Sequence, residues 1–215
     1  MAFGYPVSLE LAGRKAVVIG ELAVAEGKAD QLLAAGAAVM VVATAPGSTL
    51  ERLEREGGAR VVRRAYQPGD LEDAFVCVAS SDDPAVREAV YREGRAGGVL
   101  VNVMDDISHC DFAAPAVVRR GDLTISVATG GRSPALARRL RIELSRQFGP
   151  EWEELLDIVG TVRGETLAAL PDLSERSRRW QRALDTDELL ALLREGRRDE
   201  ARARLLDRLT GEGVA

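Results

Sequence analysis

The sequence is poor in the residues that build disulfide frameworks, zinc sites and aromatic cores. It has two cysteines and one histidine among 215 residues, and aromatic side chains make up only 4%. Cys77 and Cys110 are too few for a disulfide framework, and their spacing matches no zinc motif. We therefore expect reduced thiols, as in a cytoplasmic protein, no metal site, and a core built from Ala, Val, Leu and Ile.

Long apolar segments and a strong net charge are also missing. No run reaches the ~18 apolar residues that identify a membrane helix, because Gly36 interrupts the longest one, residues 32–45. The first ten residues lack the basic and apolar regions of a secretory signal. A net charge of −5 argues against general affinity for nucleic acid. These absences predict a cytoplasmic protein whose partners include neither a membrane nor a nucleic acid.

The first half of the chain alternates apolar strands with helices. Hydrophobic residues make up 46% of the sequence and charged residues 29%, which is the ordinary balance of a globular protein. The pattern predicts strands at residues 15–19, 38–42, 60–63, 74–79 and 99–103. Continuous apolar strands separated by helices predict an α/β fold, a Rossmann-like doubly wound parallel sheet covered on both faces. Ligands of such sheets bind at the carboxyl ends of the strands.

Two of the intervening helices carry capping signals. Ser48, with Glu51 three residues later, is the predicted N-cap of the helix after the second strand. Pro84 opens the helix after the fourth strand, and either Asp82 or Asp83 is available as its cap.

A different pattern begins after Phe112. Residues 116–119 and 123–128 predict an antiparallel hairpin around Gly121-Asp122. Ser133-Pro134 then begins a helix that runs through Gln147, and apolar residues at helical spacing predict a bundle of helices beyond it. We expect three parts: residues 1–112, 113–147 and 148–215.

The turn after the first strand is a candidate phosphate-binding turn. Gly20 and Ala25 fit the first and last positions of a dinucleotide fingerprint between a strand and a helix. Leu22 replaces the middle glycine, Glu21 adds a carboxylate, and no acidic residue ends the second strand to bind a ribose. By itself this turn is compatible with a dinucleotide site or with a plain strand–helix connection.

A second candidate lies at the carboxyl end of the fifth strand, where Asp105 and Asp106 follow Val103. A carboxylate in this place can serve as a general base, and it can equally serve as an ordinary cap of the strand end. His109 is given no role.

The third candidate is a basic segment in an acidic protein. Residues 113–147 contain seven arginines against two carboxylates, a net charge of +5. These arginines are Arg119, Arg120, Arg132, Arg138, Arg139, Arg141 and Arg146. Gly130-Gly131 precede a helix N-terminus, whose free N–H groups favour anions. A solvated helix face is one explanation, but the local excess favours a small polyanionic ligand.

Residues 101–141, VNVMDDISHCDFAAPAVVRRGDLTISVATGGRSPALARRLR, resemble the precorrin-2 dehydrogenase family, also known as the siroheme synthase N-terminal domain. The likeness lies in the Asp after strand five, the Cys-Asp-Phe step, the Arg-Gly-x-Leu hairpin and the Gly-x-Ser-Pro-x-Leu-Ala-Arg helix start. Tyr5-Pro6 and the LeuGluLeuAlaGlyArg segment before strand one extend it over nearly the whole chain. Members oxidise precorrin-2 to sirohydrochlorin with NAD, and some also insert ferrous iron. They are homodimers with an interlocking hairpin region and a helical C-terminal part.

The resemblance implies a role for each part and for individual residues. Residues 1–112 would bind NAD, residues 113–147 would dimerise and bind the tetrapyrrole, and Asp105 would be the catalytic aspartate. The expected cofactor-binding residues are Gly20, Ala23, Val24, Thr44, Ala45, Ser80 and Ser81. The expected substrate-binding residues are Arg119, Arg120, Gly130, Gly131, Arg132 and Ser133. The family usually reads Gly-Gly-Gly at the phosphate turn, where this chain has Gly20-Glu21-Leu22.

The leading hypothesis is therefore an NAD-dependent precorrin-2 dehydrogenase of siroheme biosynthesis. One alternative is a sirohydrochlorin ferrochelatase that lacks dehydrogenase activity and takes ferrous iron as a substrate. The other is a non-catalytic tetrapyrrole carrier that binds through its arginines.

Overall fold

A computed structural model describes residues 4–20, 23–167 and 170–211 of the chain. The chain forms two compact units, residues 1–114 and 115–215, called unit 1 and unit 2 below. The first predicted boundary, at residue 112, lies close to the division between the units. The roles assigned to residues 113–147 and 148–215 stay predictions.

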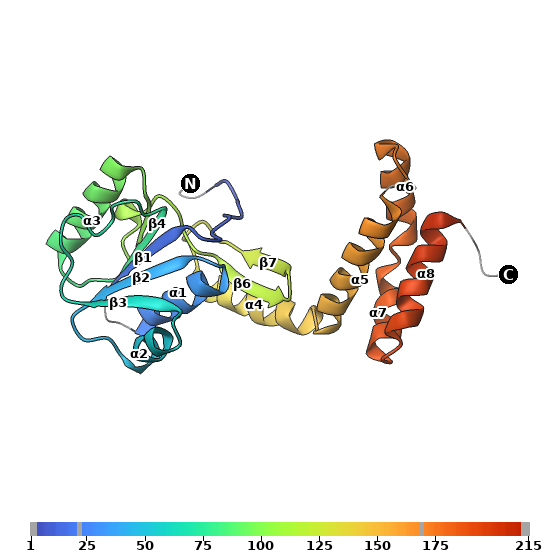
Figure 1. The fold of residues 1–215 in the computed structure, drawn as a ribbon, viewed down its shortest axis with the longest axis horizontal. Helices are drawn as coiled ribbons and strands as arrows, with labels where there is room; N and C mark the ends of the chain where they lie inside the picture. The colour runs from blue at the N-terminus through green and yellow to red at the C-terminus, as the bar shows by residue number, and fades with distance from the viewer. Residues whose placement is uncertain (1–3, 21–22, 168–169, 212–215) are drawn as a thin grey trace. The chain divides into compact units, whose positions relative to one another are not determined.

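Unit 1 contains a five-stranded parallel sheet with the strand order β3-β2-β1-β4-β5 (Figure 1). Its strands are β1 (Lys15–Ile19), β2 (Ala38–Ala43), β3 (Ala59–Arg63), β4 (Val76–Ala79) and β5 (Leu100–Val103). Its helices are α1 (Ala23–Ala34), α2 (Ser48–Arg55), α3 (Pro84–Gly97) and the short 3₁₀ helix η1 (Ile107–His109). The Rossmann-like fold is confirmed. The strand order reverses between β1 and β4, which is where doubly wound sheets bind their ligands.

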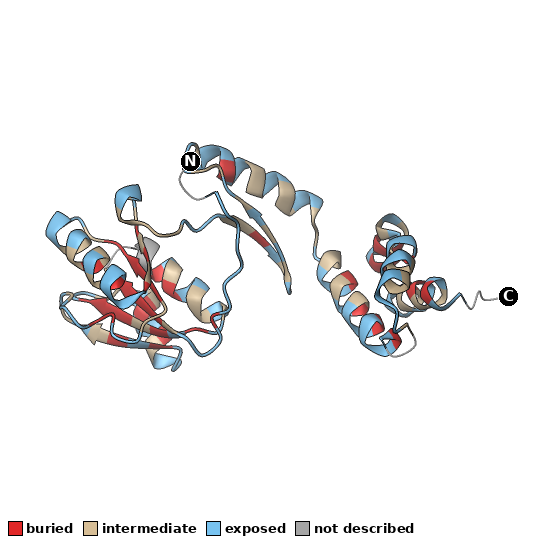
Figure 2. Cartoon of the chain, turned by 90° about the horizontal axis from the view of Figure 1, so that it is seen from above, coloured by how far each residue is buried: buried red, intermediate tan, exposed pale blue. Residues whose placement is uncertain are grey.

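The strands of unit 1 are apolar on both faces because helices cover both faces. Ala16 and Val18 of β1 enter a cluster with residues of α1 and α2, whereas Val17 and Ile19 enter a cluster that contains Val90 of α3. Figure 2 shows this buried sheet as a block of red ribbon. Each fully buried Val or Ile side chain contributes roughly 1.5–3 kcal/mol relative to an exposed one.

Helix α3 approaches β5 unusually closely. A Cβ placed on Gly94 would lie 2.2 Å from Cγ2 of Val101, so only a glycine fits at this contact. Of the two residues that the sequence offered as the cap of the helix, Asp82 and Asp83, it is Asp83 that accepts a hydrogen bond from the Ala85 N–H, at 2.8 Å. The Asp83 cap fixes where α3 begins, and the Gly94–Val101 contact sets how closely the helix packs on β5.

Two sequence predictions need correction in unit 1. The predicted cap Ser48 is the first residue of α2, and Gly47 is the N-cap, with no side-chain hydrogen bond. The Glu26 carboxylate lies against Gly47, where an added Cβ would meet its Oε1 at 2.2 Å. Strand β4 begins at Val76 rather than at residue 74, because the Ala74 N–H closes a turn on Leu71.

Unit 2 begins with a hairpin and one helix. Strands β6 (Ala116–Arg120) and β7 (Leu123–Val127) pair antiparallel around Gly121-Asp122, and α4 (Pro134–Gln147) packs against both. Ser133 caps α4 by accepting the Leu136 N–H at 3.2 Å. The predicted hairpin and the predicted Ser-Pro helix start are both present.

The rest of unit 2 is a bundle of helices with a leucine-rich core. It contains α5 (Glu151–Thr166), α6 (Leu173–Ala183), α7 (Thr186–Arg194) and α8 (Arg198–Thr210). The leucines Leu189, Leu205 and Leu209 are fully buried at its centre. None of the described helices combines the length and the apolar character that crossing a membrane requires.

Candidate active site

A cavity of about 160 Å³ opens at the carboxyl edge of the sheet in unit 1. Ser80, Ser81 and Asp82, which follow β4, line one side, and Met104, Asp105 and Asp106, which follow β5, line another, with Arg87 of α3 between them. The sequence placed Ser80, Ser81 and Asp105 at this edge. The structure brings the three together in one cavity.

Asp105 occupies a turn with an uncommon backbone conformation. The Met104 N–H donates to the Ala79 carbonyl at 2.8 Å, and the Asp106 N–H closes the turn on the Val103 carbonyl at 3.2 Å. Asp105 has φ of +61°, and among the described residues Asp73 is the other non-glycine with positive φ. An aspartate tolerates this left-handed region at a cost of roughly 1–2 kcal/mol. The turn presents the exposed Asp105 side chain at the cavity.

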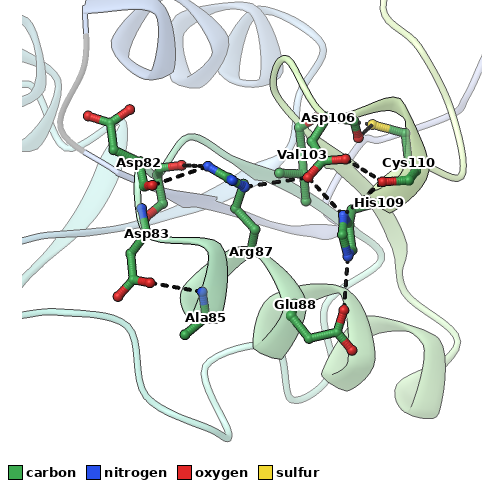
Figure 3. A network of polar contacts seen from close by, with 11 residues as sticks. Asp82, Asp83, Ala85, Arg87, Glu88, Val103, Asp106, His109 and Cys110 are labelled. Carbon is green, nitrogen blue, oxygen red and sulfur yellow. Dashed lines mark hydrogen bonds and ion pairs between the residues drawn. The ribbon is translucent and has the colours of Figure 1, made fainter.

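Neighbouring Asp106 is the centre of a polar network (Figure 3). Its carboxylate accepts a hydrogen bond from the Ser108 hydroxyl at 2.5 Å and lies 2.8 Å from Nδ1 of His109 and 3.4 Å from Nε of Arg87. The Ser108 hydrogen bond, followed by His109, holds the pKa of Asp106 below its ordinary value. The Cys110 thiol donates to the carbonyls of Val103 at 3.1 Å and Asp106 at 3.2 Å. Side chains thus hold both ends of the turn that carries Asp105.

Arg87 connects the two strand ends. Its guanidinium donates to the Ser81 carbonyl at 2.9 Å and to the Asp82 carbonyl at 3.3 Å, while its Nε faces Asp106. The sequence analysis did not single out this arginine. The sequence did carry a signal for it: Arg87 lies one turn into the helix that follows β4, close to the strand ends where such sheets bind ligands.

Gly20 marks the end of β1 beside this cavity. It has φ of +121°, and a Cβ placed on it would lie 2.0 Å from the Ser80 carbonyl oxygen. The Gly20 N–H donates to Val42 at 3.0 Å, and the Ser80 N–H donates to Ile19 at 2.7 Å. The ends of β1 and β4 therefore converge with no side chain between them, at the point where the strand order reverses. Only a glycine allows this close backbone contact, which joins the two strand ends at the edge where doubly wound sheets bind dinucleotides.

The other predicted cofactor residues belong to the end of β2 and the start of α1. Thr44 and Ala45 directly follow β2, and Ala23 and Val24 begin α1, although the side chains of these two are outside the described part. Glu21 and Leu22, which replace the usual glycines, lie outside the described residues.

The predicted substrate residues all lie in unit 2. Arg119 is exposed, whereas Arg120 donates to the carbonyl and hydroxyl of Ser145 at 2.8 and 3.0 Å and so ties β6 to α4. Arg132 is exposed beside Gly130 and Gly131, which both have positive φ. Ser133 already uses its hydroxyl as the cap of α4. Arg119 and Arg132 are therefore the predicted arginines that remain accessible to a ligand.

Helix α4 carries a second, open cavity of about 410 Å³. It is lined by Ala135, Arg138, Arg139, Ile142, Glu143 and Arg146. The Arg139 Nε donates to Glu143 at 3.0 Å, so one of the three arginines that line the cavity is paired with a carboxylate.

Comparison with known proteins relates both units to siroheme biosynthesis. Residues 7–116 match the family model described as "Putative NAD(P)-binding", and residues 120–147 match the model described as "Sirohaem biosynthesis protein central". The chain is 34% identical over 206 residues to a siroheme synthase of Pseudomonas paraeruginosa, covering 96% of this chain and 44% of that protein. It is 32% identical over 177 residues to siroheme synthase 1 of Serratia proteamaculans, covering 82% and 37%. The chain thus spans less than half the length of these curated relatives.

Among solved structures, the chain is similar to "SirC, precorrin-2 dehydrogenase". The match has a TM-score of 0.70 and 26% sequence identity, and it covers 96% of this chain and 99% of that one.

Proposed function

The chain belongs to the NAD(P)-binding family whose model its residues 7–116 match, and from this premise we propose that it oxidises precorrin-2 to sirohydrochlorin with NAD as the hydride acceptor. The SirC structure, which the chain matches almost end to end, carries the name of this activity. The observation that carries the proposal is the exposed Asp105 carboxylate in a cavity with Ser80 and Ser81, at the sheet edge where Gly20 meets the Ser80 carbonyl.

NAD, when bound, supplies the acceptor for the hydride that leaves the substrate. The residues that would hold it are Gly20, at the end of β1, Ala23 and Val24, which begin α1, and Thr44 and Ala45, which follow β2. Ser80 and Ser81 line the cavity that also contains Asp105, and would contact the cofactor there.

Asp105 performs the proton transfer in this proposal. As the hydride leaves precorrin-2, the Asp105 carboxylate accepts a proton from the tetrapyrrole, so that two electrons and two hydrogens leave the substrate. A positioned carboxylate of this kind contributes roughly 10²–10⁴-fold to a rate. The carboxylates of the substrate would bind Arg119 and Arg132, and the N–H groups of Gly130 and Gly131 would add anion-binding donors.

We also propose that the protein is a cytoplasmic homodimer. Residues 115–147 are all described, and among them only Val118 and Ala137 are buried, whereas Leu136 is 48% and Ile142 38% exposed. A hairpin and helix with so little core of their own are consistent with a surface that a second copy covers. The two free cysteines are consistent with a reducing compartment.

The same carboxylate favours ferrochelatase activity as a second candidate. Inserting ferrous iron into sirohydrochlorin requires removal of pyrrole N–H protons, which Asp105 can accept in the same place. The candidate therefore differs from the first in its need for NAD, and not in the residue that it uses.

The test is turnover of precorrin-2 with and without NAD, followed by NADH formation and by the absorbance of sirohydrochlorin. We expect NAD-dependent turnover that falls about 10³-fold in Asp105→Asn, because the amide keeps the shape but cannot accept the proton. Asp73→Asn is the matched control, since Asp73 has φ of +59° and lies outside the cavity. Its turnover should equal that of the wild type.

Three results would redirect the proposal. Iron insertion without NAD-dependent oxidation would favour the ferrochelatase. Tight tetrapyrrole binding without turnover, unaffected by Asp105→Asn, would favour the carrier. Equal losses in Asp105→Asn and Asp73→Asn would mean that the loss comes from the backbone rather than from proton transfer.

A further inference from the structure

His109 lies between two carboxylates on different elements. Its Nδ1 is 2.8 Å from Oδ2 of Asp106, in the loop after β5, and its Nε2 is 2.9 Å from Oε2 of Glu88 on α3. The ring of Tyr91, also on α3, meets it edge-on at 5.1 Å between centroids. The imidazole therefore joins the loop that carries Asp105 to α3 (Figure 3).

The contacts form a row of alternating charges. Arg92 donates to Glu88 at 2.8 Å, Glu88 faces His109, His109 faces Asp106, and Asp106 faces Arg87. A carboxylate oxygen only accepts hydrogen bonds, so both ring nitrogens must donate, and both donate only in the imidazolium form. The geometry thus requires the charged histidine for both contacts to be hydrogen bonds.

We propose, building on the dehydrogenase function proposed above, that His109 is a positioning residue for Asp105: it holds Asp106 and Glu88 together and so fixes the left-handed turn that presents the Asp105 carboxylate. The turn has one closing backbone hydrogen bond, from Asp106 to Val103, at 3.2 Å. A residue with positive φ returns to a more common conformation when its surroundings do not hold it. His109, Ser108 and Arg87 hold the Asp106 side of this turn, and Cys110 holds its carbonyls.

Loss of the His109 proton breaks one of the two contacts. A neutral imidazole has one donor and one acceptor nitrogen, and its acceptor would face a carboxylate. The Ser108 hydroxyl, 3.2 Å from Nδ1, can then turn from Asp106 to the ring, which removes a second support of Asp106. The groups in contact with the ring are Glu88 and Tyr91 from α3 and Asp106 and Ser108 from the loop. Behind the two carboxylates lie Arg92, which pairs with Glu88, and Arg87, which faces Asp106.

The pKa directions agree with this geometry. The Glu88 hydrogen bond, followed by that of Asp106, raises the pKa of His109 above 6.5. The His109 hydrogen bond lowers the pKa of Glu88 in turn. The imidazolium therefore persists to a higher pH than in an isolated histidine.

The first experiment needs no substrate. Because the chain has one histidine, labelled histidine gives a single Hε1 ring signal in NMR spectra of the full chain. We expect this signal to titrate above pH 6.5 and the amides of Asp105 and Asp106 to shift with the same midpoint. Glu88→Gln should lower that midpoint. A ring that titrates while both amides stay unmoved would overturn the proposal.

The second experiment measures kcat and KM against pH for precorrin-2 oxidation. We expect His109→Ala to lower kcat about tenfold with KM for both substrates changed less than about twofold, since a displaced catalytic group costs rate more than binding. The wild-type kcat should fall as pH rises through the His109 midpoint, and His109→Ala should lack this fall. His109→Asn, whose amide can still donate to Asp106, should recover part of the rate.

Arg95→Gln is the matched control. Arg95 on the same helix binds Asp111 of the same loop at 3.1 Å, without touching Asp106. It should leave the pH profile unchanged, and an identical loss in Arg95→Gln and His109→Ala would overturn a specific role for His109. The NMR experiment tests whether His109 positions the turn, and it needs no oxidation of precorrin-2. If the protein proves not to oxidise precorrin-2, the proposed function fails but the NMR test of His109 still stands.

Discussion

Units 1 and 2 use polar side chains for different purposes. In unit 1, polar groups with little exposure lie where they fix the backbone: Asp70 is 6% exposed and accepts from Arg64 and from the Gln67 N–H, and Ser80 is 7% exposed at the cavity. In unit 2, charges pair mainly on the helix surfaces, as Arg202 and Glu165 do. Such surface pairs contribute about 0–1 kcal/mol each. Polar contacts in unit 1 thus fix the backbone, including that of the cavity, whereas those in unit 2 are mainly ion pairs on the helix surfaces.

The cores of the two units also differ in how closely their backbones pack. Unit 1 packs Val and Ala between close backbones, and its glycines at positions 20 and 94 leave no room for a Cβ. The bundle of unit 2 packs leucines between helices, and Gly196, at the end of α7, has open space around it. The comparison indicates that unit 1 tolerates added side-chain atoms less well than unit 2, especially at the carboxyl edge of the sheet, where the cavity lies.

The strongest test of this difference is a pair of glycine substitutions. Gly20→Ala should cost more than about 3 kcal/mol in free energy of unfolding, because the new Cβ meets the Ser80 carbonyl and the positive φ disfavours alanine. Gly196→Ala has φ of +74° but no such contact, and should cost only about 1 kcal/mol. Chemical denaturation of both variants measures the difference. Equal costs would mean that backbone strain alone, and not the close approach, distinguishes the two positions.

A leucine truncation in the bundle tests whether the units are separable. Leu205 is fully buried, and Leu205→Ala should cost roughly 2–5 kcal/mol through lost burial and the cavity left behind. Calorimetry should show the transition of unit 2 at a lower temperature, with the transition of unit 1 and NAD binding unchanged. A single transition that moves as a whole would show that the units unfold together.

The smallest expected effect is on the pH dependence of stability. The raised pKa of His109 means that its contribution is complete below pH 6.5 and is lost as the pH rises through the folded-state pKa. The lowered pKa values of Asp106 and Glu88 mean that their contributions are complete above 3.8 and 4.5 respectively, and are lost only at lower pH. The transition of unit 1 should therefore fall slightly as the pH rises above 6.5 and passes through the raised pKa of His109.

Unit 2 supplies the internal control, because it contains no histidine and no cysteine. Burial raises the pKa of Cys77 and of Cys110, so the thiols of unit 1 titrate at higher pH. His109→Asn should remove the pH dependence of unit 1. A fall of equal size in both transitions would assign the effect to something other than His109.

Much of the fold could be predicted because its signals are local or periodic. The buried strands are continuous apolar runs, and the caps Asp83 and Ser133 lie directly before Pro84 and Pro134. Ser48 failed as a cap because Gly47, pressed against the distant Glu26, takes that position. A capping pattern cannot report such a contact.

The site could be predicted only in part for the same reason. Asp105, Ser80 and Ser81 follow apolar strands, and that place alone brings them together. The partner of His109 on α3, Glu88, is 21 residues away in the chain, and Arg87 of the same helix likewise reaches forward to Asp106. Neither contact follows a period or a motif.

The close packing at Gly94 also affects residues elsewhere on α3. Helix α3 lies against Val101 there, and Arg87 and Glu88 sit about two turns toward its N-terminus, roughly 9–10 Å along the axis. Anything that lifts the helix at Gly94 also changes the reach of these two side chains to the Asp105 loop. A substitution at Gly94 should therefore slow the proposed reaction, although this residue lies two helical turns from the cavity and touches no substrate.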